Sequence, residues 1–175
     1  MMAKTVTLCK PIRPKRLNVD AVRLELLNNT RKEGTAVKKE LEKTVMDWDK
    51  KPKFEALVGL THNDVTLIVG PSTPTKLVER WNWINEGTDP YTIRAKRAPY
   101  LNFRIGYNSG SRPDTLDTRR GYYIGNYWRR KRSVRHPGIK ARGWTGIVTK
   151  RQMPKFIKST NKALRDGMAK GGWDE

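Results

Sequence analysis

The sequence predicts an α+β fold, in which a long N-terminal helix packs on an antiparallel sheet of about four to six strands and a C-terminal helix follows. Three observations support this prediction. Apolar residues recur every three or four positions over residues 19–48, which is the period of a helix. Apolar and polar residues alternate over residues 100–105, which is the period of a half-buried strand. Residues 154–168 again carry a helical pattern.

The N-terminal helix is expected to pack on the sheet through one apolar stripe. Asn18 or Asp20 can cap its first turn, because short polar side chains accept hydrogen bonds from the free N–H groups there. Gly34 costs about 1 kcal/mol relative to alanine inside a helix, so we expect a bend or a break at that residue. The stripe consists of Val19, Val22, Leu26, Thr30, Gly34, Val37, Leu41, Val45 and Trp48.

Residues 1–17 are expected to form an extended basic arm. Pro11 and Pro14 fit neither a helix interior nor a central strand. A disordered tail is the alternative interpretation of this segment. Residues 18–175 have the length of a single domain. This domain carries a long insert near residues 106–121, which we interpret as a loop or an extended hairpin tip and expect to be mobile in the free subunit.

Several short strands are predicted in the middle of the chain. Two of them flank a turn at residues 61–64 and form a β-hairpin. Residues 75–83 fit either a helix or a strand. From residue 81 onward, we interpret the chain as short strands separated by turns. These strands lie within residues 54–58, 65–69, 81–88, 92–96, 100–104 and 133–136.

The C-terminal helix is expected to begin at Pro154, because proline suits the first position of a helix. Gly171 and Gly172 are expected to end it. Its apolar face is expected to bury four side chains. They are Phe156, Ile157, Leu164 and Met168.

The charge of the chain says more about its partners than about its fold. The chain has 37 Lys and Arg against 17 Asp and Glu, a net charge of +20. Residues 119–173 hold sixteen Lys and Arg and one acid, so the basic character belongs to the C-terminal third. Such a charge favours nucleic acid or an acidic protein surface as a partner. No apolar run approaches the roughly 20 residues that span a bilayer, and no secretory signal is expected.

The best candidate for binding is the aromatic and basic segment over residues 122–135. Lys and Arg neutralise phosphates, and Tyr or Trp can stack on bases. The alternative, which the pattern favours, places the aromatic side chains in the core and the cations in water, because aromatic residues on strands usually pack. The predicted contacts to a protein partner or to DNA phosphates are Arg119, Arg120, Arg129, Arg130, Lys131, Arg132, Arg135, Lys140 and Arg142.

No catalytic, metal or cofactor site is expected. A single cysteine, Cys9, excludes an internal disulfide and a cysteine-based zinc site. His62 and His136 have no partner at metal-ligand or triad spacing, and we interpret His136 as a turn residue that bonds the backbone. His62-Asn63-Asp64 suggests a metal-dependent nuclease, and the Pro113–Asp114 pair matches the start of a restriction-type nuclease motif. The acid and lysine that this motif requires downstream are missing.

Two motif turns, Glu86-Gly87-Thr88 and His136-Pro137-Gly138, occur in a characteristic order with the strands between and around them and the flanking helices. This order resembles the small neck and tail-completion proteins of long-tailed bacteriophages, a family of tail components. The resemblance covers residues 19–170. After the second turn the family has Pro-Phe and then a Pro-Ala pair, whereas this chain has Gly143-Trp144 and then Met153-Pro154.

The resemblance implies a structural virion protein. Such a protein would form a homo-oligomeric ring at the head–tail junction and would lie in the host cytoplasm during assembly. It would contact a portal-side connector or head-closure protein, a tail terminator or tail tube protein, and genomic DNA in the channel. It would have no cofactor and no membrane partner. The alternative is a stand-alone, sequence-nonspecific nucleic-acid-binding protein, and a nuclease is the least favoured interpretation.

Overall fold

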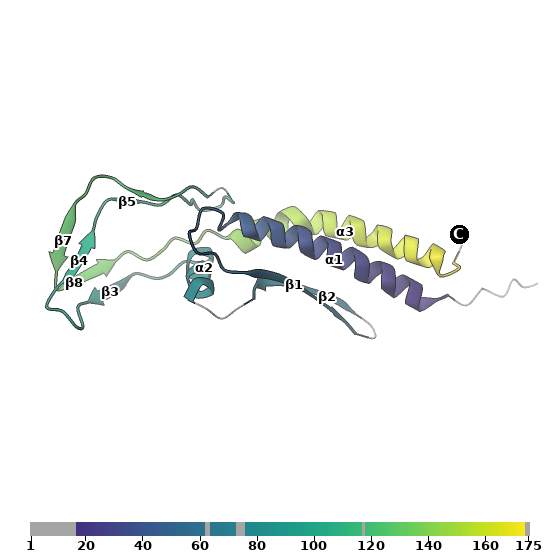
Figure 1. Cartoon of the computed structure of the whole chain (residues 1–175). Coiled ribbons are helices and arrows are strands. Elements are labelled where there is room, and N and C mark those ends of the chain that lie inside the picture. The colour runs from purple at the N-terminus through teal and green to yellow at the C-terminus, as the bar shows by residue number, and fades with distance from the viewer. Residues whose placement is uncertain (1–16, 62–63, 73–75, 117, 174–175) are drawn as a thin grey trace, which may run out of the picture.

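The computed structural model describes residues 17–61, 64–72, 76–116 and 118–173, and they confirm the α+β class. The arm expected at residues 1–17 therefore lies outside the described residues except for Leu17. The molecule is elongated (Figure 1): α1 and α3 form one end with β1 and β2 beside them, strands β3 to β8 form the other end, and α2 lies between. The elements are α1 (Val19–Lys43), β1 (Phe54–Leu60), β2 (Val65–Pro71), α2 (Lys76–Glu86), β3 (Tyr91–Arg94), β4 (Leu101–Arg104), β5 (Tyr107–Asn108), β6 (Tyr122–Tyr123), β7 (Trp128–Lys131), β8 (Ser133–His136) and α3 (Trp144–Lys170).

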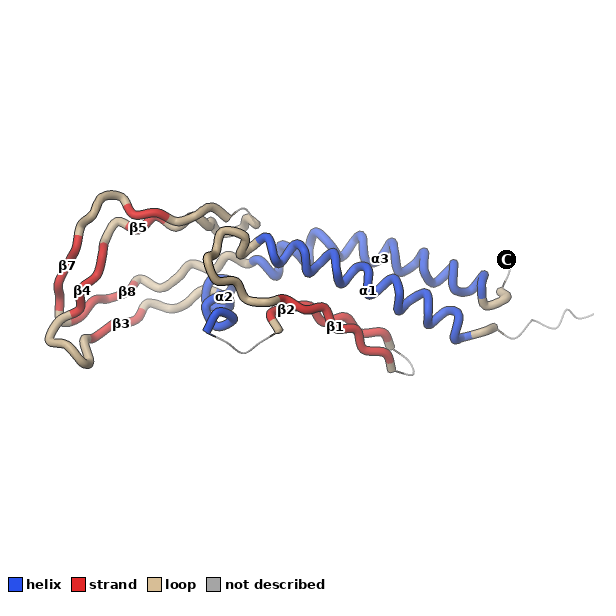
Figure 2. The backbone as a smooth tube through the Cα atoms, viewed as in Figure 1, coloured by secondary structure: helices blue, strands red, loops and turns tan. Residues whose placement is uncertain are grey.

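Helices α1 and α3 lie side by side and run antiparallel, and the predicted hairpin β1–β2 lies along them (Figure 2). The two helices approach closely at Gly167, where an added Cβ would stand 2.8 Å from the Cα of Val22. Lys170 bonds Glu25 across the pair, and this hydrogen bond raises the pKa of the lysine. We refer to α1, α2, α3 and the hairpin together as the body.

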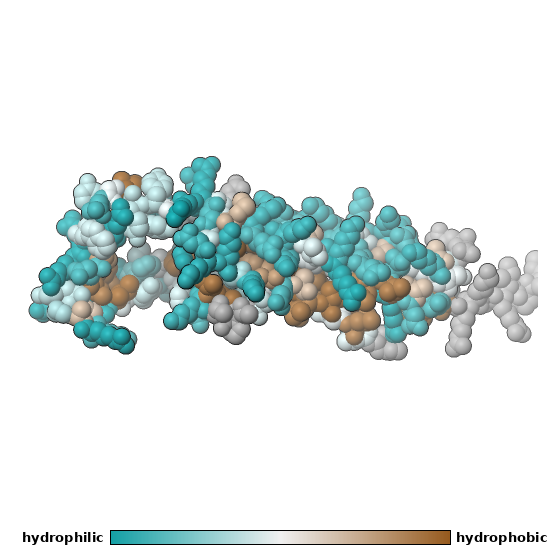
Figure 3. Space-filling model, in the orientation of Figure 1, coloured by the Kyte–Doolittle hydropathy of each residue, from teal (hydrophilic) through white to brown (hydrophobic). Residues whose placement is uncertain are grey.

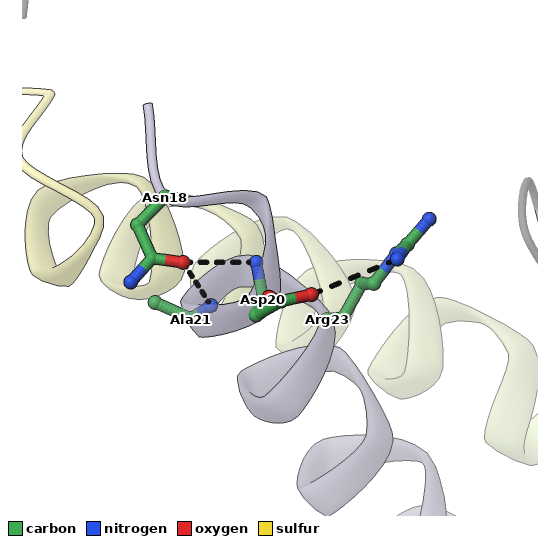
Figure 4. A network of polar contacts seen from close by, with 4 residues as sticks. All are labelled: Asn18, Asp20, Ala21 and Arg23. Atoms are coloured by element: carbon green, nitrogen blue, oxygen red, sulfur yellow. Dashed lines mark hydrogen bonds and ion pairs between the residues drawn. The ribbon is translucent and has the colours of Figure 1, made fainter. Parts of the chain in front are cut away.

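The first turn of α1 is capped by Asn18, one of the two predicted candidates. Its Oδ1 accepts hydrogen bonds from the backbone N–H groups of Asp20 (3.1 Å) and Ala21 (3.4 Å), as Figure 4 shows. The carboxylate of Asp20 instead pairs with Arg23 at 3.7 Å. An acid in the first turn also suits the positive end of the helix dipole.

Helix α1 runs without interruption through Gly34, so the predicted break is wrong. An added Cβ at Gly34 would stand 2.7 Å from Cδ1 of Leu67 and 3.2 Å from Cβ of Ala56. The missing side chain therefore makes room for the hairpin. The helix ends at Lys43, earlier than expected, and the chain continues in turns that still bury Val45.

The core lies where the body meets the remaining strands. Trp81 packs between Phe54 and Trp144, with ring centroids 5.6 and 6.0 Å away. Its indole N–H donates to the buried hydroxyl of Thr44 at 2.9 Å. The strand predicted over residues 81–88 is wrong, because α2 occupies most of this segment. The buried positions of α2 are Val78, Trp81 and Asn85, which follow helical spacing.

Helix α3 begins at Trp144, ten residues before the predicted start, so Pro154 lies inside the helix. The fully buried indole of Trp144 anchors this early start in the core. The buried face follows Trp144, Val148, Gln152, Ala163 and Gly167. As a result, Ile157 and Leu164 of the predicted face are exposed, whereas Phe156 and Met168 are partly buried. The expected end at Gly171 and Gly172 is confirmed.

Strands β3 to β8 pair as β3–β8, β4–β7 and β5–β6, and they follow one another as a long antiparallel hairpin. We call residues 88–139 the β-ribbon. Together with β1–β2, the described strands therefore form four two-stranded sheets. Six residues, 95–100, separate β3 from β4, whereas only Arg132 separates their partners β7 and β8. Such unequal insertions interrupt the pairing of the two strands and bend a ribbon. The ribbon accordingly curves back toward the helices (Figures 1 and 2).

Candidate interaction surface on the β-ribbon

The two motif turns meet at the base of the β-ribbon. The backbone N–H of Thr88 donates to the carbonyl of Ile139 at 2.9 Å, and the reverse bond measures 3.1 Å. Gly87 and Gly138 have φ angles of 84° and 85°, a region that strongly favours glycine. An added Cβ on Gly138 would stand 2.3 Å from the carbonyl oxygen of Thr88. Both glycines are therefore required for the two turns to touch.

The remaining motif residues also belong to the architecture of this base. The Nδ1 atom of His136 accepts a hydrogen bond from the N–H of Gly138 at 3.1 Å, which confirms the predicted turn role. The imidazole stacks on Tyr91, with ring centroids 4.8 Å apart. Glu86 ends α2 and, like Pro137, is exposed. These residues therefore set the backbone geometry at the point where the ribbon leaves the body.

A buried asparagine that sequence reasoning missed joins the base to α3. Asn85 is 5% exposed, and its Oδ1 accepts a hydrogen bond from the N–H of Thr145 at 3.1 Å. Gly143, at the N-cap, offers no side chain to that first turn, so Asn85 supplies the acceptor instead. The only sequence signal was the position of Asn85 one helical turn after Trp81.

The tip of the β-ribbon is fixed to the core. Leu116 is 6% exposed and packs in the same cluster as Trp144. The indole N–H of Trp144 donates to the carbonyl of Thr115 at 3.1 Å. The insert near residues 106–121 is thus the tip of a hairpin, and the burial of Leu116 argues against the mobile loop that we expected.

Arg142 bonds two serine hydroxyls near this tip. Its Nε donates to the hydroxyl of Ser111 at 3.1 Å, and its Nη2 donates to that of Ser109 at 3.2 Å. Its Nη1 donates to the carbonyl of Lys140 at 3.0 Å. Partial burial lowers the pKa of Arg142 from its ordinary value. All three nitrogens are engaged within the chain, which sets Arg142 apart from the other predicted contact residues.

The aromatic side chains of residues 122–128 are exposed, so their predicted place in the core is wrong. Tyr127 and Trp128 are 65% and 63% exposed. A two-stranded ribbon has no second layer to cover them, which is the physical reason for the difference. Some rings pack within the ribbon instead: Tyr107 contacts Tyr123 at a centroid distance of 5.0 Å, and the guanidinium of Arg104 lies 4.4 Å over Tyr123.

Most of the predicted contact cations are exposed on this ribbon and its base. Among the described residues, only Arg120 of this group forms an ion pair, with Asp49 at 3.8 Å. Arg130 and Arg132 lie 4.2 and 5.8 Å from the ring centre of Tyr100. The exposed members are Arg119, Arg120, Arg129, Arg130, Lys131, Arg132, Arg135 and Lys140.

A second uncovered surface lies on the β1–β2 hairpin. Leu57 and Ile68 are cross-strand partners, 61% and 62% exposed, on the face turned away from the helices. Leu60 at the hairpin end is 48% exposed. Figure 3 shows apolar residues gathered along this hairpin, next to largely hydrophilic helices. We call Leu57 and Ile68 the hairpin patch, because the alternation along β1 places Leu60 on the other face, with Ala56.

Two further findings concern the part of the chain that the structure describes. No group of three or more His, Cys, Asp and Glu side chains is close enough to hold a metal ion there. None of the described helices is long and apolar enough to cross a bilayer. His62, the other histidine considered, lies outside the described residues.

Comparisons of this chain with protein-family models, curated proteins and solved structures find no match. The resemblance to neck and tail-completion proteins therefore stays a prediction from the order of its motifs.

Proposed function

We propose that this chain is a structural virion protein, a ring-forming neck or tail-completion subunit that joins the head and tail of a long-tailed bacteriophage around the DNA channel. The observation that carries the proposal is the uncovered β-ribbon. A two-stranded ribbon is marginally stable in water by itself. This one exposes large aromatic side chains along much of its length, which is typical of a surface that a partner covers.

The two uncovered surfaces also suit a ring. A head-to-tail ring needs two different and mutually complementary surfaces on each subunit. The β-ribbon is aromatic and basic, whereas the hairpin patch is small and apolar, and the two lie on opposite sides of α2 in the elongated molecule (Figure 1). Trp, Tyr and Arg are the residues enriched at the energetic centres of protein interfaces, and the ribbon holds all six Tyr of the chain, ten Arg and Trp128.

The net charge indicates what the neighbours must provide. Subunits that each carry +20 repel one another when they are brought together in a ring. Acidic surfaces on a portal-side connector or head-closure protein, on a tail terminator or tail tube protein, or the phosphates of DNA would offset this repulsion. We propose these as the partners, and we propose no membrane partner and no cofactor.

The assembly state of the recombinant protein tests the proposal. We expect native mass spectrometry to find closed multiples of the 20.2 kDa subunit, either alone or after addition of a neighbouring ring. Electron microscopy of purified particles should locate the protein at the head–tail junction. A strictly monomeric protein that is absent from particles would overturn the proposal.

We further propose that the chain has no catalytic activity, and plasmid DNA provides the check. Incubation with divalent metal ions should leave supercoiled plasmid uncut. Metal-dependent cleavage that the His62→Ala variant abolishes would contradict this expectation and favour the nuclease interpretation.

The exposed aromatic residues also favour a second candidate, a stand-alone nucleic-acid-binding protein. Unstacked rings beside arginines are typical of nucleic-acid-binding surfaces. A soluble monomer that shifts DNA in a gel, with no ring under any condition, would favour this candidate over the first.

A further inference from the structure

We propose that the outer part of the β-ribbon, formed by β3, β4, β7 and β8, binds the phosphate backbone of duplex DNA. The inference goes beyond the ring proposal, because it names one partner for one surface and does not require a ring to form. It rests on the charge of the ribbon, on the placement of that charge on both ribbon faces, and on the way the ribbon is held.

The charge of this part of the chain is strongly one-sided. Residues 88–142 contain fourteen Lys and Arg against three Asp. Four consecutive cations, residues 129–132, occupy β7 and the residue after it, and all four are exposed. Within the described residues, none of these four forms an ion pair with a carboxylate of the same chain. Uncompensated like charges this close repel one another, and a bound polyanion would reduce that repulsion. The reduced repulsion favours the binding of a polyanion at this site.

The strand register places these cations on both faces of the ribbon. Arg129 is the cross-strand partner of Phe103, and Lys131 is that of Leu101, so these two cations share one face. Arg130 is paired with Asn102 and therefore projects from the opposite face.

Arg132 joins that opposite face, since it lies over Tyr100 together with Arg130. A flat protein surface can meet only one face of a ribbon. The groove of a duplex has phosphates along both walls, and the major groove is wide enough, at about 12 Å, to admit a two-stranded ribbon. The placement of the cations on both faces thus favours duplex DNA over an acidic protein.

The conformation of the ribbon is also fixed by contacts within the chain, before any partner binds. Its base is fixed by the paired backbone bonds of Thr88 and Ile139, and its tip by the burial of Leu116. Arg104 fastens the bend between these two ends, because its Nη2 donates to the carbonyl of Gly125 at 2.7 Å. A surface that is ordered in advance loses less conformational entropy on binding.

Arginine predominates over lysine in this set, and its planar fork matches phosphate oxygens. Contacts of this kind fix position on the duplex without reading sequence. We therefore expect binding that is insensitive to sequence and falls steeply with salt.

Fluorescence anisotropy with two unrelated 30-base-pair duplexes tests this inference on the full chain. The Arg129→Gln, Arg130→Gln, Arg132→Gln triple variant should bind more weakly. Its plot of log affinity against log salt should flatten by about 0.9 for each phosphate that the variant no longer neutralises, or roughly 3 for the three arginines together. The matched control changes Arg31, Arg151 and Arg165 on the helices to Gln, which removes the same charge and should leave the slope nearly unchanged.

A second triple variant guards against a folding artefact. Arg130 and Arg132 contact Tyr100, so their replacement can disturb the ribbon locally. The Arg129→Gln, Lys131→Gln, Arg135→Gln variant leaves those contacts intact and should flatten the slope similarly. Unchanged thermal unfolding of each variant confirms that the fold is preserved.

Three outcomes would overturn the inference. Equal weakening in the ribbon and helix variants would mean that only net charge matters. Tighter binding to a 30-nucleotide single strand, abolished by Trp128→Ala, would mean that the ribbon stacks bases. Wild-type affinity for DNA in both ribbon variants would show that these cations only face solvent and do not contact DNA. If the protein forms a ring but does not bind DNA, this inference is wrong and the proposed function is still supported. If the protein binds DNA but is always monomeric, the proposed function is wrong and this inference is still supported.

Discussion

The body and the β-ribbon use the same residue types in opposite ways. In the body, Trp81 and Trp144 are 2% and 0% exposed, and each indole N–H has a hydrogen-bond acceptor. In the ribbon, Tyr127 and Trp128 are 65% and 63% exposed. The difference lies in the number of layers, because helices and the hairpin cover one another whereas a two-stranded ribbon has nothing above or below it. An aromatic residue of this chain is therefore buried where a second layer covers it, as at Trp81 and Trp144, and not on the uncovered ribbon.

The two regions also differ in how they are stabilised. The body is stabilised by apolar burial around one core cluster. The ribbon is stabilised mainly at its two anchors, the motif turns at the base and Leu116 at the tip. We expect substitutions in the body to lower the global free energy of unfolding. Substitutions between the two ribbon anchors should instead weaken the binding of partners.

The largest expected effect is that of Leu41→Asp, which would bury an unpaired charge in the body. Leu41 is 3% exposed in the core cluster. We expect the free energy of unfolding to fall by about 4 kcal/mol or more. Urea unfolding followed by circular dichroism measures the change. The control Leu24→Asp lies on the same helix at a 56% exposed site and should change stability by no more than about 0.5 kcal/mol.

Leu116→Ala separates the tip anchor from the rest of the ribbon. Removal of this buried side chain should lower the free energy of unfolding by about 2–4 kcal/mol. It should also speed trypsin cleavage at Arg119 and Arg120, since the tip would open more often. Ile124→Ala, at a 60% exposed ribbon position, is the control. Identical digestion of wild type and Leu116→Ala would mean that the tip is held by other contacts, such as those of Arg142.

Thr44→Val tests the polar bond inside the core. The substitution keeps the shape of the side chain but leaves the indole N–H of Trp81 without its acceptor, which should cost about 1–3 kcal/mol. Thr35→Val, on the exposed side of α1, should cost much less. Equal unfolding midpoints for wild type and Thr44→Val would contradict the importance of this bond.

The smallest effect on stability is expected for Trp128→Ala in the ribbon. Because the side chain is 63% exposed, the free energy of unfolding should change by no more than about 0.5 kcal/mol. If the ribbon is a subunit contact, the same variant should weaken assembly, as native mass spectrometry would show. A large fall in the stability of the monomer would mean that Trp128 belongs to the ribbon's own packing.

Local patterns in the sequence were sufficient for several elements. The helical period predicted α1, Asn18 was one of two candidate caps, and two strands that flank a turn composition predicted the β1–β2 hairpin. The ends of α3 show the limit of this reasoning: the glycines marked its C-terminus, but Pro154 suggested a start ten residues too late. Nothing local marks Trp144 as the true start, because a distant core holds it.

The candidate site shows the same division. The sequence alone determined which residues are basic and aromatic, where the two glycine turns fall, and that His136 bonds its own turn. Only the tertiary structure decided that the two motif turns pair, that Leu116 returns to the core, and that the aromatic residues of the ribbon stay uncovered. Each of these depends on contacts between residues far apart in the chain, and local composition carries no information about which layer, if any, lies above a strand.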